Sequence, residues 1–275
     1  MSVVDIEKCK ELRKRIFITG YKGGMAHLAS CFSALEIIYV LYEKNILRFD
    51  AKDPHMRDRD RFILSKGHAG LALYAVMQDV GFLSKDDFES YLQPGGRIGG
   101  EPCMRDVPGI EATTGSLGHG LSMGLGMALG QKIRNINAKT YVMLGDGECQ
   151  EGTVWEAIMS APALGLNNLV VILDSNKIQK MDTVENIMRF SDLGDKVSTF
   201  GWEVKYVDGH DIEALTNCLG DEKEYNKPLF IIANTTKGKG VSIMENNPIW
   251  HFKLPNKKEK KIFMEELNIT ESEME

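Results

Sequence analysis

The stretch of sequence that decides the fold runs from Thr140 to Gln179, TYVMLGDGECQEGTVWEAIMSAPALGLNNLVVILDSNKIQ. It contains two short apolar runs, Thr140–Leu144 (TYVML) and Leu169–Leu173 (LVVIL), separated by a helix-forming stretch at Thr153–Leu164. Short, mainly apolar runs are typical of strands buried on both faces, and a helix between two such strands makes them parallel. The stretch therefore predicts a strand, helix, strand unit inside a sheet that helices cover.

The same alternation of apolar runs and helical spacing extends along the chain on both sides. Further strands are predicted at Arg61–Ser65, Trp202–Val207 and Leu229–Ala233, and further helices at Asp5–Thr19, Ser33–Leu47, Ala69–Val80, Leu121–Ile133 and Ile212–Leu219. The predicted fold class is α/β, a parallel β-sheet covered by helices on both faces.

Two segments lack this alternation. Gln93–Gly118 is rich in glycine and proline and is long enough to be a functional loop. The charged segment of residues 253–275, which contains KLPNKKEKK, is expected to be a solvated tail or a peripheral helix. We therefore expect one domain over residues 1–252, followed by this segment.

The amino-acid composition indicates which binding partners and which cellular compartment to expect. The 33 lysines and arginines against 39 aspartates and glutamates leave a formal net charge of -6, which is unfavourable for binding nucleic acid or an anionic membrane. The 5 cysteines are scattered without zinc-type spacing, so we expect reduced thiols. With no signal-type or membrane-spanning apolar run, the sequence indicates a cytoplasmic protein that acts on a small molecule or another protein.

Polar residues follow both central strands at the ends where parallel strands bind ligands. Gly145-Asp146-Gly147 follows the first strand, and Asn176 follows the second, 30 residues on (176 minus 146). Carboxylate and amide oxygens suit Mg²⁺ or Ca²⁺, and the Gly147 N–H group and the following helix start suit an anion. A lone GDG is also an ordinary turn, but a second strand ending in Asn makes a metal-held diphosphate the better hypothesis.

At this point the sequence resembles a known family. LGDGECQEGTVWEA followed by LDSNKIQ resembles the thiamine-diphosphate motif of the transketolase family, in which GDG is followed by Asn at about this distance. Three further motifs resemble the same family in the same order, SKGHA at 65–69, GIEATTGSLGHGLSMGLG at 109–126 and TTKGKGVSIMENNPIWH at 235–251. The resemblance implies a thiamine-diphosphate-binding domain of the pyrophosphate type.

The resemblance implies specific contacts with the metal and the diphosphate. Asp146 and Asn176 would bind the metal through their side chains and Ile178 through its backbone carbonyl, while Gly147 and Glu151 would lie in the cofactor site. Lys237, in TTKGKG, is assigned to the cofactor phosphate, and a solvated lysine is the alternative that the residues alone leave open.

The same resemblance implies which residues contact the rest of the cofactor and the substrate. Gly115, Ser116 and Leu117, in TTGSLG, would meet the aminopyrimidine. His68, in SKGHA, would lie beside the diphosphate and the substrate carbonyl, and His27 aligns with another family histidine. Neutral imidazoles at these places can donate to a developing alkoxide and move protons, although either histidine alone also fits a structural role.

The sequence departs from the family pattern in the loop before TTG. Gly100-Glu101-Pro102 stands where many transketolases have GHP, so a carboxylate replaces a histidine that would touch sugar hydroxyls. We include Glu101 among the catalytic residues, and its presence leaves the donor substrate open. Lys180 stands at a position that is usually apolar near the cofactor, where it either pairs with an acidic group of a partner or points outward.

The family resemblance also implies a partner chain. In the family, the glutamate that activates thiamine lies on a second domain, and no such domain fits in the 24 residues after His251 (275 minus 251). We therefore expect the C-terminal transketolase subunit on a separate chain, a two-plus-two heterotetramer, and a small-molecule sugar or keto substrate.

The expected activity is transfer of a two-carbon ketol or acyl unit with thiamine diphosphate and Mg²⁺ (or Ca²⁺). One alternative is an enzyme of specialised sugar biosynthesis with a modified sugar or pyruvate donor, and another is a non-catalytic regulatory subunit. The third alternative, a nucleotide-binding dehydrogenase, ranks lower because GSLGHG at 115–120 lacks GxGxxG spacing.

Overall fold

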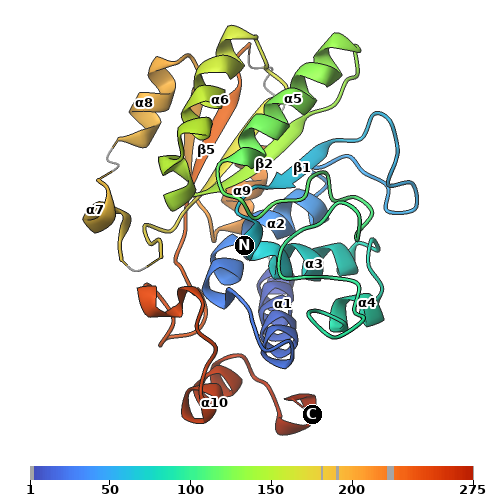
Figure 1. The fold of residues 1–275 in the computed structure, drawn as a ribbon, viewed down its shortest axis with the longest axis vertical. Helices are drawn as coiled ribbons and strands as arrows, with labels where there is room; N and C mark the ends of the chain where they lie inside the picture. The colour runs from blue at the N-terminus through green and yellow to red at the C-terminus, as the bar shows by residue number, and fades with distance from the viewer. Residues whose placement is uncertain (1–2, 181, 190–191, 222–225, 275) are drawn as a thin grey trace.

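The computed structural model describes residues 3–180, 182–189, 192–221 and 226–274, and its centre is a parallel sheet with helices on both faces (Figure 1). The sheet has 5 strands in the order β1-β2-β3-β5-β4. The strands are β1 Arg61–Leu64, β2 Thr140–Gly145, β3 Leu169–Ser175, β4 Glu203–Asp208 and β5 Leu229–Asn234. The predicted α/β class and the predicted strand positions are confirmed, with ends that differ by one or two residues.

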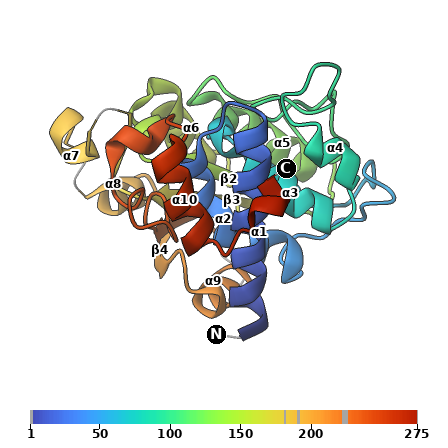
Figure 2. The same cartoon turned by 90° about the horizontal axis from the view of Figure 1, so that it is seen from below.

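The helices form two layers, one on each face of the sheet (Figures 1 and 2). One layer contains α1 Val3–Lys22, α2 Leu28–Glu43, α3 Gly70–Asp79 and α9 Ile212–Leu219, and the other contains α5 His119–Ile133, α6 Gly152–Ala163 and α8 Leu193–Thr199. The shorter helices are α4 Lys85–Glu89, α7 Val184–Ile187, α10 Lys257–Glu266 and α11 Glu271–Met274. Residues 93–118 contain no helix or strand, as predicted.

The side chains of the central strands alternate between the two layers. On β3, Val170 and Ile172 belong to the apolar core beneath α1, α2 and α3, whereas Val171 and Leu173 belong to the core beneath α5 and α6. Successive residues of a strand point to opposite faces, so a strand covered on both sides needs an apolar residue at every position. This requirement explains the uninterrupted LVVIL run.

Two predicted elements differ from the structure. The apolar run at Trp202–Val207 was expected to be buried on both faces, but β4 is an edge strand and Tyr206 is 61% exposed. Trp202 precedes the strand and is buried, with its indole N–H donating to the Ile158 carbonyl at 2.7 Å. The helix predicted at Ser33–Leu47 begins earlier, at Leu28, and ends at Glu43, before Asn45 takes a positive φ of 56°.

The register of β2 and β3 places the functional loops. Thr140 pairs with Leu169 at one end of the ladder, and Gly145 pairs with Asp174 at the other. Because the two strands are parallel neighbours, the segments that begin at Asp146 and Asn176 leave the sheet at the same edge. This adjacency is what the sequence predicted.

The segment after residue 252 contains helix α10, which lies beside α1 (Figure 2). Asn256 caps its N-terminus by accepting hydrogen bonds from the N–H groups of Lys258 and Glu259. Phe263 is fully buried and stacks on Phe17 of α1, with 4.9 Å between ring centroids. The division of the chain at residue 252 stays a prediction.

No helix within the described part of the chain is both long enough and apolar enough to cross a membrane.

Close packing of α5 on the β1 loop gives a test of the fold. A Cβ atom at Gly120 would lie 2.8 Å from the Ser65 α-carbon, so Gly120→Ala is expected to lower the free energy of unfolding by about 1–3 kcal/mol, measured by urea denaturation. Gly126→Ala, on the same helix with nothing within 4 Å of the added methyl group, is the control and is expected to stabilise by about 0.5–1 kcal/mol. Equal effects of the two substitutions would show that close packing is not the cause.

Candidate functional site

A cavity of about 410 Å³ lies at the edge of the sheet where β2 and β3 end. Its lining contains all but one of the residues predicted for the site, namely His27, His68, Glu101, Gly115, Leu117, Asp146, Gly147, Glu151, Asn176, Ile178 and Lys237. The exception is Ser116, which is exposed and does not contribute to the lining. Residues from separate stretches of sequence therefore meet at one place, and their individual roles stay predictions.

Asp146 has a half-buried carboxylate whose negative charge is only partly compensated. Its Oδ2 accepts a hydrogen bond from the Lys177 N–H group at 2.6 Å, which Lys177 presents with a φ of 66°. Burial and the neighbouring charge of Asp174 raise the pKa of Asp146 to about 6. A bound cation would supply the missing positive charge.

The oxygen atoms around Asp146 suit a hard cation. The side-chain oxygen of Asn176 accepts from the Ile178 N–H group at 3.1 Å, and both residues line the cavity with Asp146. A carboxylate, an amide oxygen and a backbone carbonyl match the ligand types of Mg²⁺ and Ca²⁺. Within the described residues, no group of three or more His, Cys, Asp or Glu is arranged for a metal.

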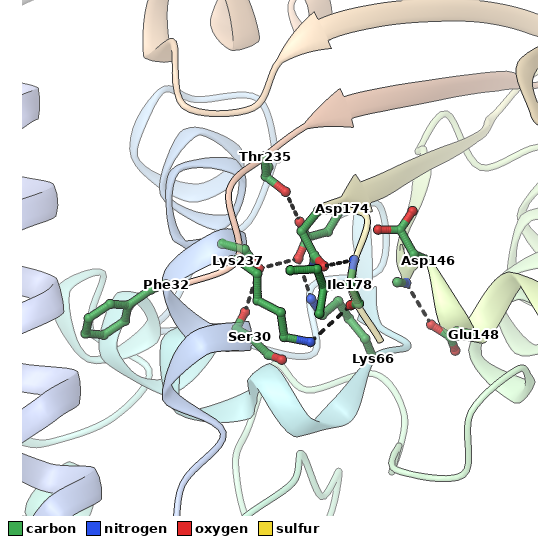
Figure 3. Close-up of polar contacts among 12 residues, drawn as sticks. Ser30, Phe32, Lys66, Asp146, Glu148, Asp174, Ile178, Thr235 and Lys237 are labelled. Carbon is green, nitrogen blue, oxygen red and sulfur yellow. Dashed lines mark hydrogen bonds and ion pairs between the residues drawn. The ribbon is translucent and has the colours of Figure 1, made fainter. Parts of the chain in front are cut away.

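Lys237 is buried and lines the cavity, and Figure 3 shows its side chain pointing toward Ile178. Only 2% of it is exposed, so the alternative of a solvated lysine is wrong. Its Nζ donates to the Ile178 carbonyl at 3.1 Å and lies 3.1 Å from His251 Nδ1. Burial and the charge of Lys66 lower the pKa of Lys237 to about 8. This ammonium group faces the same space as the predicted metal ligands.

An ion pair that the sequence did not reveal lies at the cavity wall, where Lys66 contributes to the lining. The Lys66 ammonium pairs with Asp174, and both side chains are almost completely buried. Asp174 also accepts from Ser33 Oγ at 2.6 Å and from the Thr235 hydroxyl (Figure 3). Burial by itself raises the pKa of Asp174, but the charge of Lys66 and these hydrogen bonds take the net pKa below its ordinary value.

Glu148 is a second buried carboxylate that the sequence analysis missed. It accepts hydrogen bonds from the Ser65 hydroxyl, from the Gly118 N–H group at 2.9 Å and from the Gly145 N–H group at 3.1 Å. These contacts join the loop after β1, the long loop before α5 and the loop after β2. The only hint in the sequence was its place next to Gly147.

Three histidines gather at one wall of the cavity. Ring centroids are 5.3 Å apart for His27 and His68, 5.3 Å for His27 and His251, and 5.6 Å for His68 and His251. Burial is the main cause that lowers the pKa of each histidine, and the charges of nearby lysines lower it further. The pKa of His27 falls to about 4, that of His251 falls to about 3, and that of His68 lies well below its ordinary value. All three rings are therefore neutral at pH 7 and each offers an N–H donor.

A second polar network holds the segment that carries Lys237. The Thr236 N–H group donates to His210 Nε2 at 2.8 Å, and His210 Nδ1 lies 3.1 Å from Glu36 Oε2. Glu36 in turn accepts from Arg13 Nη2 at 2.6 Å. Since His210 Nε2 accepts a hydrogen bond, the ring proton of His210 lies on Nδ1. No motif in the sequence indicated a role for these side chains.

The buried ion pair predicts a large effect on stability. Lys66→Met leaves Asp174 buried without a counter-charge, and this change is expected to lower the free energy of unfolding by about 3–5 kcal/mol, measured by urea denaturation. Adding Asp174→Asn to the same variant is expected to recover part of the loss. Lys85→Met, in an exposed pair with Glu89, is the control and is expected to cost less than about 1 kcal/mol.

The pH dependence of the unfolding free energy tests the same ion pair. Because the folded-state pKa of Asp174 lies below its ordinary value, the stabilisation that ionised Asp174 brings is present above the ordinary pKa and is lost as the pH falls through the folded pKa. The difference in unfolding free energy between wild type and Lys66→Met is therefore expected to shrink in acid. A difference that stays constant down to pH ~2 would contradict the assignment.

Comparison with known proteins identifies the family. Residues 17–256 match the family described as the thiamine diphosphate binding domain of transketolase. An apulose-4-phosphate transketolase subunit of Phocaeicola vulgatus is 39% identical over 244 residues, which cover 88% of this chain and 86% of the relative. The 6-deoxy-6-sulfo-D-fructose transketolase subunit SqwG of a Clostridium species is 36% identical over 231 residues, which cover 84% of each chain.

Larger transketolases match over less of their own length. The solved transketolase of Campylobacter jejuni superimposes with a TM-score of 0.89 at 29% identity, over 98% of this chain and 43% of that one. The human transketolase is 35% identical over 94% of this chain and 42% of its own length. The chain therefore spans less than half of these two proteins.

These similarities confirm the resemblance that the motifs indicated, and they do not favour the dehydrogenase alternative. The chain belongs to the transketolase family, in which it corresponds to the thiamine-diphosphate-binding domain.

Proposed function

We propose that this chain is the cofactor-binding subunit of a two-chain transketolase, a transferase that moves a two-carbon ketol unit between sugar-type substrates. The observation that carries the proposal is the single cavity in which the predicted metal ligands and three neutral histidines face one another. The match to two proteins named as transketolase subunits, over at least 84% of each, supports the two-chain form.

The cavity fits thiamine diphosphate held through Mg²⁺, with Ca²⁺ as a substitute. The side chains of Asp146 and Asn176 and the carbonyl of Ile178 would bind the metal, and Lys237 and the Gly147 N–H group would bind the diphosphate. The raised pKa of Asp146 supports this assignment, because it marks a half-buried carboxylate whose negative charge is only partly compensated.

The remaining lining residues would hold the ring system and the substrate. Gly115 and Leu117 would meet the aminopyrimidine, with Ser116 beside them and Glu151 hydrogen-bonded within the site. Bound thiamine diphosphate supplies a nucleophilic carbon for addition to a ketone. As neutral N–H donors, His27 and His68 would hydrogen-bond to the substrate oxygen on which negative charge develops, and they would move its proton.

The partner would be the C-terminal subunit of the split enzyme, in a two-plus-two assembly. An apolar rim beside the cavity supports a partner at this place. Phe252 is 50% exposed although its ring lies 4.7 Å from the His27 ring, and Ile249 nearby in sequence is 70% exposed. Met25, two residues before His27, is 42% exposed. Exposed apolar groups around a binding site are typical of surfaces that another chain covers.

The same proposal includes the predicted domain and compartment. The family match ends at residue 256, which supports residues 1–252 as the cofactor-binding domain. The free cysteines, all five of them, support a reducing compartment such as the cytoplasm.

A modified sugar donor is the second candidate, favoured by the two relatives whose names specify apulose 4-phosphate and 6-deoxy-6-sulfo-D-fructose. A regulatory subunit without activity is less well supported, because Asp146, Asn176, Glu151 and His68 are all retained in the cavity lining.

Metal-dependent cofactor binding tests the assignment of Asp146. In calorimetry with thiamine diphosphate on the assembled enzyme, Mg²⁺ is expected to be required, and Asp146→Ala is expected to weaken binding by about 100-fold or more. Glu185→Ala removes an exposed carboxylate outside this cavity and is expected to leave binding unchanged. Binding that persists undiminished in EDTA would contradict a metal-held diphosphate.

Separating the chains tests the two-subunit form. This chain alone is expected to show no ketol transfer, and activity is expected to appear when a C-terminal transketolase subunit is added at equimolar concentration. Product formation can be followed by chromatography. Full activity of this chain without a second polypeptide would overturn the two-chain form.

A further inference from the structure

The backbone around Glu101 is held firmly against the helix that follows His68. The Tyr74 hydroxyl of α3 donates to the Glu101 carbonyl at 2.8 Å, and the Thr114 N–H group donates to the Pro102 carbonyl at 3.1 Å. Pro102 also packs on Gly70, where an added Cβ would lie 3.0 Å from its ring. The position of Glu101 is therefore set by contacts on both sides of the loop.

The carboxylate of Glu101 lies over the backbone of Gly115. Gly115 has a φ of 136°, and a Cβ atom there would lie 1.8 Å from Glu101 Oε2, so the carboxylate occupies the space that a side chain would need. Gly115 in turn touches the loop that carries His68, because a Cβ at Gly67 would lie 2.8 Å from the Gly115 N atom. These contacts place the carboxylate in the lining of the cavity, next to the segment assigned to the aminopyrimidine.

Within the described residues, no hydrogen bond or ion pair involves the Glu101 carboxylate. Two of the cations in the cavity wall have other partners, since Lys66 pairs with Asp174 and Lys237 donates to the Ile178 carbonyl. Glu101 is exposed as a residue, and partial desolvation of its carboxyl group raises its pKa. Its oxygen atoms are thus available to accept hydrogen bonds from a ligand.

We propose that Glu101 selects the donor substrate by charge. It accepts hydrogen bonds from neutral hydroxyl groups beside the reacting carbonyl, and it repels a donor that carries a carboxylate there. The site then takes hydroxymethyl ketones of the ketose class and rejects 2-oxo acids such as pyruvate. This inference rests on the proposed function, and it adds the residue that excludes a donor carrying a carboxylate.

Two donors that deliver the same two-carbon unit, one uncharged and one carrying a carboxylate, test the effect of donor charge. With L-erythrulose, the bond between the carbonyl carbon and the adjacent hydroxyl-bearing carbon breaks, and glycolaldehyde leaves. With hydroxypyruvate, the bond to the carboxylate breaks, CO₂ leaves and one proton is taken up. In both cases the hydroxyacetyl unit forms a new carbon–carbon bond to the carbonyl carbon of D-glyceraldehyde, and the product is the same pentulose.

The experiment compares the two donors on the assembled enzyme with thiamine diphosphate and Mg²⁺. Glu101→Gln keeps the shape and removes the charge, so it is expected to raise kcat/KM for hydroxypyruvate relative to L-erythrulose by about 10–100-fold. Glu101→His is expected to shift the ratio in the same direction. Asp106→Asn, on the same loop but outside the cavity lining, is the matched control and should leave the ratio unchanged. A ratio within about twofold of wild type in Glu101→Gln would overturn the proposal.

A binding measurement keeps the test independent of turnover. D-glycerate carries a carboxylate like hydroxypyruvate but has a hydroxyl group in place of the reactive ketone. Its dissociation constant can be measured by ligand-observed NMR. We expect about tenfold tighter binding to Glu101→Gln than to wild type. Equal binding would overturn charge selection by Glu101, whereas absence of product from both donors with both enzymes would count against the proposed function instead.

Discussion

The buried carboxylate of Asp174 is the point on which the rest of the site depends. It lies at the end of β3, fully removed from water, and burying a carboxylate is costly unless a cation and hydrogen-bond donors surround it. Lys66 supplies the cation from the loop after β1, and hydroxyl groups of Ser33 and Thr235 supply donors from α2 and the loop after β5. One charge therefore holds three chain segments in place, and the loop of Lys66 also carries His68.

The charges nearer the cavity surface are compensated less completely. Partial desolvation raises the pKa of Asp146 and that of Glu101, and the negative charge of Asp174 raises the pKa of Asp146 further. The first lies among oxygen ligands suited to a metal, and the second lies over Gly115 in the same lining. The histidines of the cavity stay neutral, because burial and nearby lysines disfavour a further positive charge. A folded protein that retains such uncompensated groups at one cavity is organised to bind charged or polar molecules there.

The supporting contacts around the cavity are as specific as the lining itself. Glu148 joins three loops through hydrogen bonds, and His210 fixes the segment of Lys237 through the Thr236 N–H group. Functional groups keep their geometry only when such outer contacts restrict them. The same family fold occurs in proteins named for different sugars, so the fold by itself does not decide the substrate.

The sequence by itself determined the parallel α/β fold and much of the site. Apolar runs buried on both faces specify parallel strands, and parallel neighbours must end at the same edge, so the proximity of Asp146 and Asn176 followed from local pattern alone. The motif resemblance supplied His27, His68 and Lys237. The position of β5 between β3 and β4 could not be predicted, because the residues of a strand do not show which other strand will lie beside it.

Only the tertiary structure decided how the distant groups are paired. Lys66 and Asp174 are 108 residues apart, and Glu36 and His210 are 174 apart, so neither partner is visible from the residues around the other. Likewise, Lys237 lies in a polar, glycine-rich stretch typical of a solvated loop, yet it is buried against the loop after β3, where it meets the Ile178 carbonyl. Burial and charge compensation depend on which segments meet in space, and a linear pattern does not contain that information.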